Sequence, residues 1–418
     1  MSRNGAHLLA AAVRAFDFEC RVLETYQGLE LGKKYTSGKE CYPCLVTLGD
    51  ILHFVKKEKQ RLGNRFSPGN YLYFMPESDG PCRFGMYNKY QRIVMDAEPE
   101  LNRLKITALT TRDGYAFDGL LEAEKIPAFK KTLFLATLAG DILDRLLWRI
   151  RPYEKIPGAT DVFIENALDR MASVIEGCGP TFAGDRILKA LEVVAKQGVD
   201  LIDPQIPRKP LVGIIGEIFL RMHTRSNQDL IRNLEKHGAE TVCASFSEWV
   251  NFVSYMALRK SKRQMRFNLG RVDARGLLRL AKEALDFGGS LIFQQLWLKR
   301  AYARIQSHID IGDDHKISNL ERILRENDLF RFDVDTEAPL SIAGILEYVA
   351  SGCNGIVNVY PFTCMPGIIT TAVIKPLLAE RRIPYLDTPY DDSIQPGRQA
   401  AIRTFMYQVQ QNHRRQQA

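Results

Sequence analysis

Short apolar runs alternate with segments of helical periodicity along the second half of this chain. A continuous apolar run of four to eight residues is typical of a buried parallel strand, whereas apolar residues spaced three and four apart indicate a helix packed on a core. The predicted strands are Leu211–Ile215, Thr241–Ala244, Gly355–Val359 and Pro384–Asp387, and the predicted helices are Asn227–His237, Gly367–Glu380 and Pro396–Gln410. This order of strands and helices predicts an α/β half with a parallel sheet.

The first half shows the same pattern less regularly. It contains a predicted helix at Tyr42–Lys57, strands at Tyr71–Met75 and Leu104–Leu109, and a mostly helical stretch over 121–200; a helical insertion is expected in the second half over about 257–330. Three prolines within Asp203–Pro210 exclude a helix or a central strand there. We therefore expect two Rossmann-like lobes with parallel sheets and helical insertions, 1–204 and 205–418, whose ligands sit at the carboxyl ends of strands.

Length and composition support this division and exclude several classes. A chain of 418 residues exceeds one small domain, and 45% hydrophobic with 25% charged residues is the composition of an ordinary globular protein. The apolar stretch Leu211–Leu220 is about half of a membrane span and carries Glu217. Near the N-terminus, Arg14 ends a short apolar patch before it reaches the length of a secretory signal. We expect a cytoplasmic protein with no membrane segment.

Charge is concentrated in one segment. Lysine and arginine exceed aspartate and glutamate by 57 to 49, and nine basic residues with one acid lie between Arg259 and Lys282. This segment is either a solvated helical face or the binding site of an anionic, phosphate-bearing ligand. Nucleic acid is not expected, because no aromatic residues or zinc-finger spacing accompany the cations. The histidines His53, His223, His237 and His315 lie outside hydrolase motifs and are expected at the surface.

Eight cysteines in a chain without a secretory signal argue against a disulfide framework and raise metal or redox chemistry instead. Three of them, Cys41, Cys82 and Cys364, stand beside glycine and proline at predicted helix starts. Unpaired amides and the helix dipole at such positions lower the pKa of a thiol, and they suit an anionic iron–sulfur cluster.

Two other uses of the cysteines remain open. Cys41 and Cys44 form a C-x-x-C pair, which is typical of a dithiol oxidoreductase and predicts that Cys82 and Cys364 are dispensable. The same four cysteines together could hold zinc in a docking protein that is not an enzyme. On a helix, Cys44 points one turn away from the tip, so it is also a candidate core residue. Cys20, Cys178, Cys243 and Cys353 show no local signal for ligation.

Several segments around these cysteines carry a family resemblance. They are Glu40–Pro43, Gly80–Tyr87, Val212–Ile218, Leu234–Glu240 and Asn354–Gly367. Together they resemble the 2-hydroxyacyl-CoA dehydratase superfamily, in its branch of activase-related and double-cubane cluster proteins. The matching segments extend over most of the chain.

This resemblance implies a [4Fe–4S] cluster, in a single or double-cubane form, in the cleft between two lobes. Cys41, Cys82 and Cys364 match the three ligand positions, with Cys44 as a possible further ligand, and three thiolates leave one iron open. The resemblance also implies a separate ATP-dependent activase as electron donor, an acyl-CoA or other small substrate, and a homo- or heterodimer. Arg83 is a candidate cation near the cluster, and Glu217 is expected to face the cleft. No Walker A sequence is present, so this chain is not expected to hydrolyse ATP.

Overall fold

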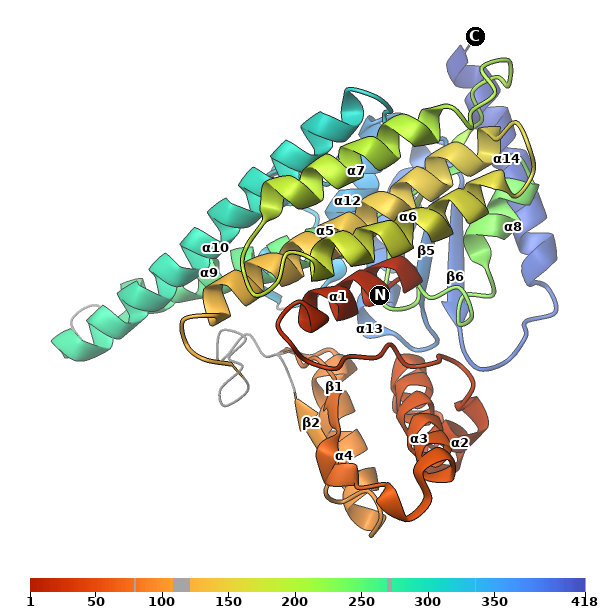
Figure 1. Ribbon diagram of the computed structural model, residues 1–418. Coiled ribbons are helices and arrows are strands. Elements are labelled where there is room, and N and C mark those ends of the chain that lie inside the picture. Colours follow the sequence, from red (N-terminus) through yellow and green to blue (C-terminus); the bar gives the residue numbers. More distant parts are fainter. Residues whose placement is uncertain (79, 108–120, 269–272, 335, 418) are drawn as a thin grey trace.

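The computed structural model describes residues 1–78, 80–107, 121–268, 273–334 and 336–417. Its described strands form two sheets, one of two strands and one of four, and every pairing between neighbouring strands is parallel. Helices make up most of the remaining chain (Figure 1). The predicted α/β class is therefore confirmed.

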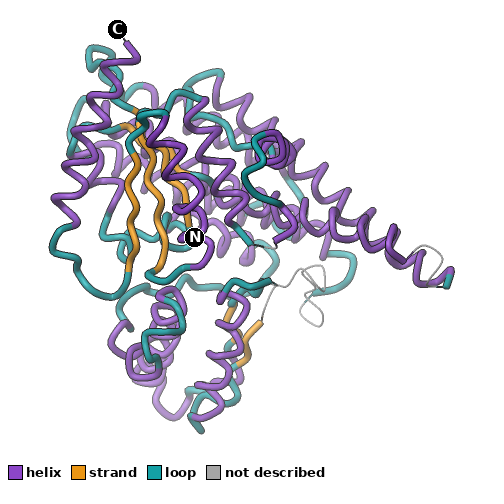
Figure 2. Tube along the Cα trace, turned by 180° about the vertical axis from the view of Figure 1, so that it is seen from behind, coloured by secondary structure: helices purple, strands orange, loops and turns teal. Residues whose placement is uncertain are grey.

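The four-stranded sheet belongs entirely to the second half of the chain and is seen well from behind (Figure 2). Its strands are β3 Leu211–Gly216, β4 Glu240–Cys243, β5 Gly355–Pro361 and β6 Tyr385–Tyr390. They are ordered β4-β3-β5-β6, and each lies within a few residues of a predicted strand. β3 and β5 are buried over nearly their whole length because helices cover both faces of the sheet.

Two apolar cores hold those helices on the sheet. The core on one face includes Leu234 of α8 and Phe405 of α14, and the core on the other face includes Leu320 of α11, Ile345 of α12 and Ile374 of α13. These helices are α8 Leu230–Lys236, α11 Ile317–Glu326, α12 Ala338–Ala350, α13 Met365–Glu380 and α14 Arg398–Gln417. The predicted helices at the end of the chain are thus confirmed.

The strand order places a crevice between β3 and β5. From β3 the chain first adds β4 on one side and then returns to add β5 on the other, so the loops after β3 and β5 leave the sheet in opposite directions. In open α/β sheets, ligands bind at this reversal, outside the carboxyl ends of the strands. Glu217 follows β3 directly and Cys364 follows β5, so both predicted site residues stand at this position.

A layer of long helices packs beside the sheet. It contains α1 Arg3–Arg14, α5 Ile126–Ile150, α6 Ala159–Glu176, α7 Gly184–Val199, α9 Phe246–Asn268 and α10 Ala274–Gln306. α5 is the central helix, because it packs against α1, α6 and α7 and also against β4 and α9. Helices from residues 1–204 therefore share a core with elements from 205–418, and the division at 204/205 stays a prediction. The segment Asp203–Pro210 contains no helix or strand, as predicted.

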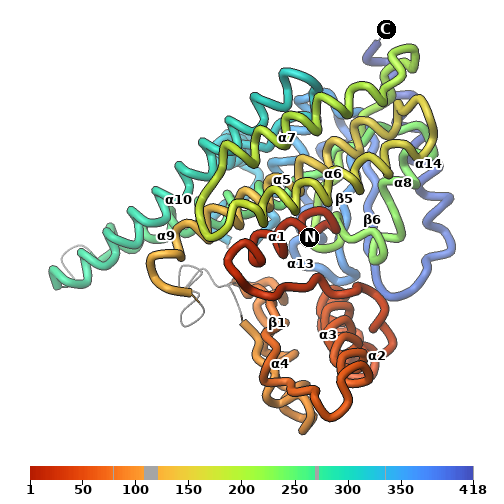
Figure 3. The backbone as a smooth tube through the Cα atoms, viewed as in Figure 1, coloured from red at the N-terminus to blue at the C-terminus, as the bar shows by residue number. Residues whose placement is uncertain are grey.

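Residues 29–107 form a group of elements, named here the small unit, which lies beyond the carboxyl ends of β5 and β6 (Figures 1 and 3). Its elements are α2 Leu29–Tyr35, α3 Tyr42–Leu62, β1 Leu72–Phe74, α4 Tyr87–Ala97 and β2 Lys105–Thr107. Its core is apolar and centred on α3, with Leu48, Ile51 and Met95 fully or almost fully buried. In place of an open sheet like that of the second half, the first half shows two paired strands of three residues each; the end of the predicted strand Leu104–Leu109 lies outside the described residues.

Short 3-10 helices complete the described structure. They are η1 Gly63–Arg65, η2 Pro68–Asn70, η3 Arg83–Met86, η4 Arg151–Tyr153 and η5 Phe332–Val334. Among the described residues, no helix combines the length and the apolar character that crossing a membrane requires.

Candidate functional site

The three predicted cysteines each stand immediately before a helix. Cys41 precedes α3 and Cys364 precedes α13, while Cys82 precedes η3, which leads into α4. The predicted placement at helix starts is confirmed. Each sulfur also lies near a backbone amide of the following turn: Tyr42 for Cys41, Phe84 for Cys82 and Gly367 for Cys364.

The three thiols are close enough to influence one another. Burial raises the pKa of Cys364, and neighbouring Glu217, Cys41 and Cys82 raise it further. Burial likewise raises the pKa of Cys82 to about 12, with Glu217 and Cys41 among the charges that contribute. Because such effects weaken with distance, these contributions indicate that the three sulfurs and Glu217 lie in the same region, with Glu337 also acting on Cys82.

The direction of these pKa shifts corrects a sequence-based expectation. Helix starts were expected to lower the pKa of the three thiols, yet each pKa is raised. Burial is the largest cause in every case and outweighs the amides, the Tyr87 hydroxyl and the Arg83 guanidinium, which act in the opposite direction. The site therefore holds neutral thiols until a cationic group compensates for burial, and binding a metal there must release protons.

Arg83 connects the loops that carry all three cysteines. Its Nη1 donates to the Lys39 carbonyl oxygen at 2.6 Å, and its Nη2 donates to the carbonyl oxygen and the hydroxyl of Thr363 at 3.0 and 3.1 Å. Lys39 lies two residues before Cys41, and Thr363 directly precedes Cys364. A single guanidinium adjacent to Cys82 thus fixes the positions of the other two cysteine loops. The sequence-based interpretation of Arg83 as a cation near the site agrees with this geometry.

The backbone is strained where these loops turn. Cys41 has φ 114° and Thr363 has φ 64°, values that non-glycine residues rarely adopt. Gly367 allows the backbone at the start of α13 to lie close to the Tyr360 ring, because a Cβ there would lie 2.4 Å from Cγ of Tyr360. Such strain persists only where surrounding contacts enforce it, and it is concentrated at functional sites.

Glu217 faces the cavity described below and is held by the turn that follows it. Its carboxylate accepts hydrogen bonds from the amides of Phe219 and Leu220 at 3.0 and 2.8 Å, while its own amide donates to Val359 of β5 at 2.7 Å. Burial raises its pKa above the usual range. The carboxylate thus both caps a local turn and lines the cavity, as expected for a residue that faces the cleft.

Of the other cysteines, Cys44 is the neighbour of Cys41, and Cys41 contributes to its raised pKa. Cys44 is fully buried against Met75 and Tyr87, and burial raises its pKa to about 12. Cys353 is buried before the start of β5, at the opposite end of the strand from Cys364, and Cys243 contacts Met222 in the core. The Cys178 thiol donates to the Val174 carbonyl oxygen at the end of α6.

A buried series of hydrogen bonds beside the site was not predicted from the sequence. His223 was expected at the surface, but it is buried, because its ring stacks on Phe219 and both ring nitrogens have partners. Thr25 lies 2.7 Å from its Nε2, and the Thr25 hydroxyl lies 2.8 Å from the Asp50 carboxylate. The side chain of His315 is only 7% exposed and pairs with Glu248 at 2.9 Å, so it also departs from the expected surface position.

The backbone amide of Ser226 fixes the donor and acceptor in each of these hydrogen bonds. The Ser226 amide can only donate, and it contacts Nδ1 of His223 at 3.2 Å, so Nδ1 is the acceptor and Nε2 carries the proton. His223 Nε2 therefore donates to Thr25, which donates to Asp50. Burial lowers the pKa of His223 to about 3 and raises that of Asp50 to about 6, so the ring stays neutral at ordinary pH.

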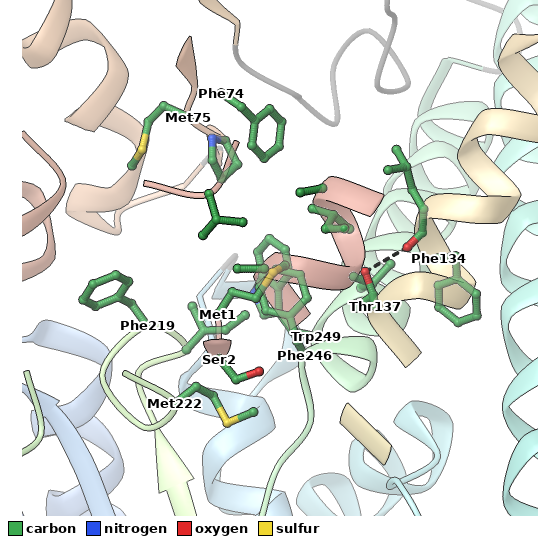
Figure 4. A pocket seen from close by; sticks show the side chains of 18 of the residues that line it. Met1, Ser2, Phe74, Met75, Phe134, Thr137, Phe219, Met222, Phe246 and Trp249 are labelled. Atoms are coloured by element: carbon green, nitrogen blue, oxygen red, sulfur yellow. Dashed lines mark hydrogen bonds between the residues drawn. The ribbon is translucent and has the colours of Figure 1, made fainter. Parts of the chain in front are cut away.

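A large cavity opens beside the cysteines, between the small unit and the helical layer. Its volume is about 2580 Å³, and Cys82, Glu217 and His223 are among the residues that line it. Phe74 and Met75 of the small unit face it from one side, and Phe219, Phe246 and Trp249 face it from the other (Figure 4). The cavity exceeds the size of most small-molecule sites and is mainly apolar near its centre.

A second, smaller hollow lies on the basic segment. It has a volume of about 320 Å³ and is lined by cations of α9 together with Met256 and Asp333. The cations are Arg259, Lys260, Lys262, Arg263 and Arg266. Lys260 also lines the large cavity, so the two spaces adjoin the same stretch of α9.

The described residues contain no group of three histidine, cysteine, aspartate or glutamate side chains placed around one metal ion. A single zinc requires every ligand atom within about 2.3 Å of one point, whereas the thiolates of an iron–sulfur cluster are separated by the cluster itself. Neither a scan against models of protein families nor searches of curated proteins and of solved structures finds a protein that this chain matches.

Proposed function

We propose that Cys41, Cys82 and Cys364 hold an iron–sulfur cluster at the carboxyl ends of β3 and β5, and that the chain is a redox protein of the 2-hydroxyacyl-CoA dehydratase type. The observation that carries this proposal is the connection of all three cysteine loops through Arg83. When bound, such a cluster supplies one-electron chemistry and an iron with one free position. In this proposal the electron comes from a separate ATP-dependent activase, and the substrate is a small molecule or an acyl-CoA.

The chain's own residues support this use of the site. Backbone amides at the starts of α3, η3 and α13 lie near the sulfurs and favour their anionic form once burial is compensated. The apolar walls of the cavity exclude water from a bound substrate. His223 lies at the cavity wall, where its Nε2 donates to Thr25 and its Nδ1 accepts from the Ser226 amide, so the neutral ring fixes this part of the wall.

The described cysteines favour a single cluster over a double cubane. A double cubane requires six cysteine ligands, whereas Cys353 is buried at the opposite end of β5, Cys243 is buried against Met222, and the Cys178 thiol donates to the Val174 carbonyl oxygen. The dithiol alternative is less well supported, since the thiol of Cys44 is fully buried with a raised pKa and is a poor nucleophile.

Anaerobic purification with quantification of iron and sulfide, together with a visible spectrum, tests the proposal. About four irons per chain indicates a single cluster and about eight a double one. Cys364→Ser should lose the iron, whereas the matched control Cys353→Ser, which changes a buried cysteine at the other end of β5, should keep it. A colourless, iron-free wild-type protein would falsify the proposal, and iron loss in Cys44→Ser alone would redirect it to the C-x-x-C pair.

The acyl-CoA part of the proposal has its own test. The cation-lined hollow on α9 provides a place for the phosphates of coenzyme A close to the large cavity. Replacing Arg263 and Arg266 by alanine should weaken binding of coenzyme A, and the loss should diminish at high salt because screening already weakens the wild-type interaction. Unchanged affinity in titration calorimetry would remove this segment from the substrate site without affecting the cluster.

A further inference from the structure

The α9–α10 hairpin extends beyond the rest of the molecule (Figures 1 and 3). α10 has 33 residues, and its second half is anchored by buried Leu291, Trp297 and Leu298. These side chains share one face of the helix, because they are spaced as neighbours on a helical surface. Trp297 and Leu298 belong to the core that α10 shares with α5, α6 and α7, so the opposite face of α10 points away from that core.

That outward face carries a line of exposed apolar side chains, named here the α10 stripe. Leu278 is 72% exposed, Leu285 75%, Ile292 69% and Leu296 52%. They are separated by seven, seven and four residues, the repeat that keeps side chains on one seam of a coiled coil. Scattered apolar residues are normal on a surface, but four large ones in one seam mark a contact site.

We propose that the α10 stripe is the surface on which two copies of this chain pair, with their α10 helices antiparallel and the two-fold axis passing by Leu285. In such an isologous contact, residues equally far before and after the axis face each other. Leu278 and Ile292 both lie seven positions from Leu285, so Leu278 of each copy faces Ile292 of the other. The stripe is therefore complementary to itself in size and in spacing.

Charge along the edge of the stripe agrees with the same pairing. Lys282 precedes Leu285 by three residues and Asp286 follows it by one, and both are exposed. In the antiparallel arrangement Lys282 of one copy faces position 288 of the other, about two positions along the helix from Asp286. The two-fold axis repeats this contact, so two such ion pairs form. Gly288 and Gly289 are next along the helix; a Cβ at Gly289 would meet nothing within 4 Å, so the backbone here is bare and permits close approach.

The same charges disfavour a lipid surface. An anionic membrane selects apolar residues flanked by cations alone. Here Asp286 lies beside the stripe and Glu283 pairs with Arg279 at 3.1 Å, so the edge is mixed in sign. A second copy supplies both signs at the required positions. This inference does not depend on the proposed cluster, because the stripe and the cysteines are carried by different elements.

Sedimentation velocity of the full chain over a wide range of concentration tests the pairing. The wild-type chain should form a dimer, and Leu285→Asp should weaken dimerisation by at least about a hundredfold, because it places two carboxylates against each other and removes the central apolar contact. Val162→Asp, a change on α6 at a residue that is 62% exposed, is the matched control and should leave the dimer intact.

A charge exchange tests the register. Lys282→Glu alone should weaken the dimer, and adding Asp286→Lys should restore it. A wild-type chain that stays monomeric, a dimer indifferent to Leu285→Asp, or a monomer that instead binds vesicles rich in anionic lipid through the α10 stripe would each overturn the proposal. Iron content measured in the same samples separates these results from those of the cluster proposal.

Discussion

At the scale of single residues, Arg83 contributes most to the site, because it fixes segments that are far apart in sequence. Its contact with Thr363 spans 280 positions. Lysine has one cationic centre and cannot reach both Lys39 and Thr363 at once.

We therefore predict that Arg83→Lys and Arg83→Ala reduce bound iron to less than about half of the wild-type amount under identical reconstitution, since the ligand loops lose their common anchor. Far-ultraviolet circular dichroism should stay unchanged. The control is Arg103→Ala, which alters an exposed arginine of the small unit. Full iron loading in Arg83→Ala would show that the three loops keep their positions without this guanidinium.

Buried carboxyl groups give a second prediction at this scale. Burial raises the pKa of Asp144 from 3.8 to about 7 and that of Asp141 to about 6. The folded protein therefore keeps protons that the unfolded chain releases from about pH 4 upward, and the free energy of unfolding falls as pH rises through this window.

Asp144→Asn copies the neutral acid and retains an oxygen that can accept the 2.8 Å hydrogen bond from Asn4. The unfolding free energy of the wild type should fall between pH 5 and pH 8. In Asp144→Asn this fall should be smaller by roughly 2–4 kcal/mol, as measured by urea titrations at each pH. Asp169→Asn, an exposed change on α6, should leave the slope as it is. An unchanged slope in Asp144→Asn would mean that this carboxyl ionises freely in the folded state.

Some residues of the candidate site could be predicted from the sequence and others could not. Cys41, Cys82 and Cys364 could be predicted because each has its signal nearby, in the turn that contains it. The chain from His223 to Asp50 could not, because Thr25 and His223 are 198 positions apart and neither belongs to a recognisable motif. Tyr87 lay inside a motif that was recognised, but its hydrogen bond to Cys41 depends on how η3 folds back.

At the scale of elements, apolar patterning located the strands well and the helix ends less well. The predicted helix Asn227–His237 begins instead at Leu230, because Gln228 and Asp229 adopt positive φ and Asn227 holds the preceding loop through its bond to the Leu220 carbonyl oxygen. α9 begins at Phe246, ahead of the insertion expected from about 257. Asp141 of α5 accepts the first amides of α9, and a cap supplied by another helix leaves no local signal.

The start of α13 gives a prediction about an element. Gly367→Ala places a Cβ 2.4 Å from Cγ of Tyr360, a contact too short to be tolerated, so the first turn of α13 must shift together with Cys364. We expect a loss of about 1–3 kcal/mol in unfolding free energy and a lower iron content. The matched control is Gly397→Ala, where a Cβ would meet nothing within 4 Å. Equal behaviour of the two variants would argue against tight packing at this helix start.

At the scale of the whole molecule, buried charges join α5 to the segment between α10 and α11. Arg145 pairs with Asp314 at 2.6 Å, with 2% and 5% of the two side chains exposed, and also donates to the Gly312 carbonyl oxygen at 2.9 Å. Removing one member of such a pair leaves the other buried without compensation.

Arg145→Met should therefore cost about 3–5 kcal/mol of unfolding free energy in urea denaturation, and the double change with Asp314→Leu should recover part of it. Arg322→Met breaks a pair whose side chains are 50% and 51% exposed, and it should cost less than about 1 kcal/mol. Similar losses in both single variants would show that water reaches the buried pair.

The arrangement of the whole chain was the least predictable feature. Similar halves were expected from similar local patterns. Among the described residues, the second half builds a four-stranded sheet, whereas 29–107 forms the small unit and α5–α7 join the helical layer. Local periodicity specifies which elements form; which elements share a core depends on contacts between distant segments.

The route of the chain through these parts has a consequence for biosynthesis. Residue 364 leaves the ribosome hundreds of positions after Cys41 and Cys82, and its loop depends on β5, which cannot pair with β3 until most of the chain has been translated. A nascent polypeptide thus displays two of its three sulfurs without their partner. If the three sulfurs hold a cluster as proposed, its delivery follows translation, and a chain truncated before β5 should bind no cluster.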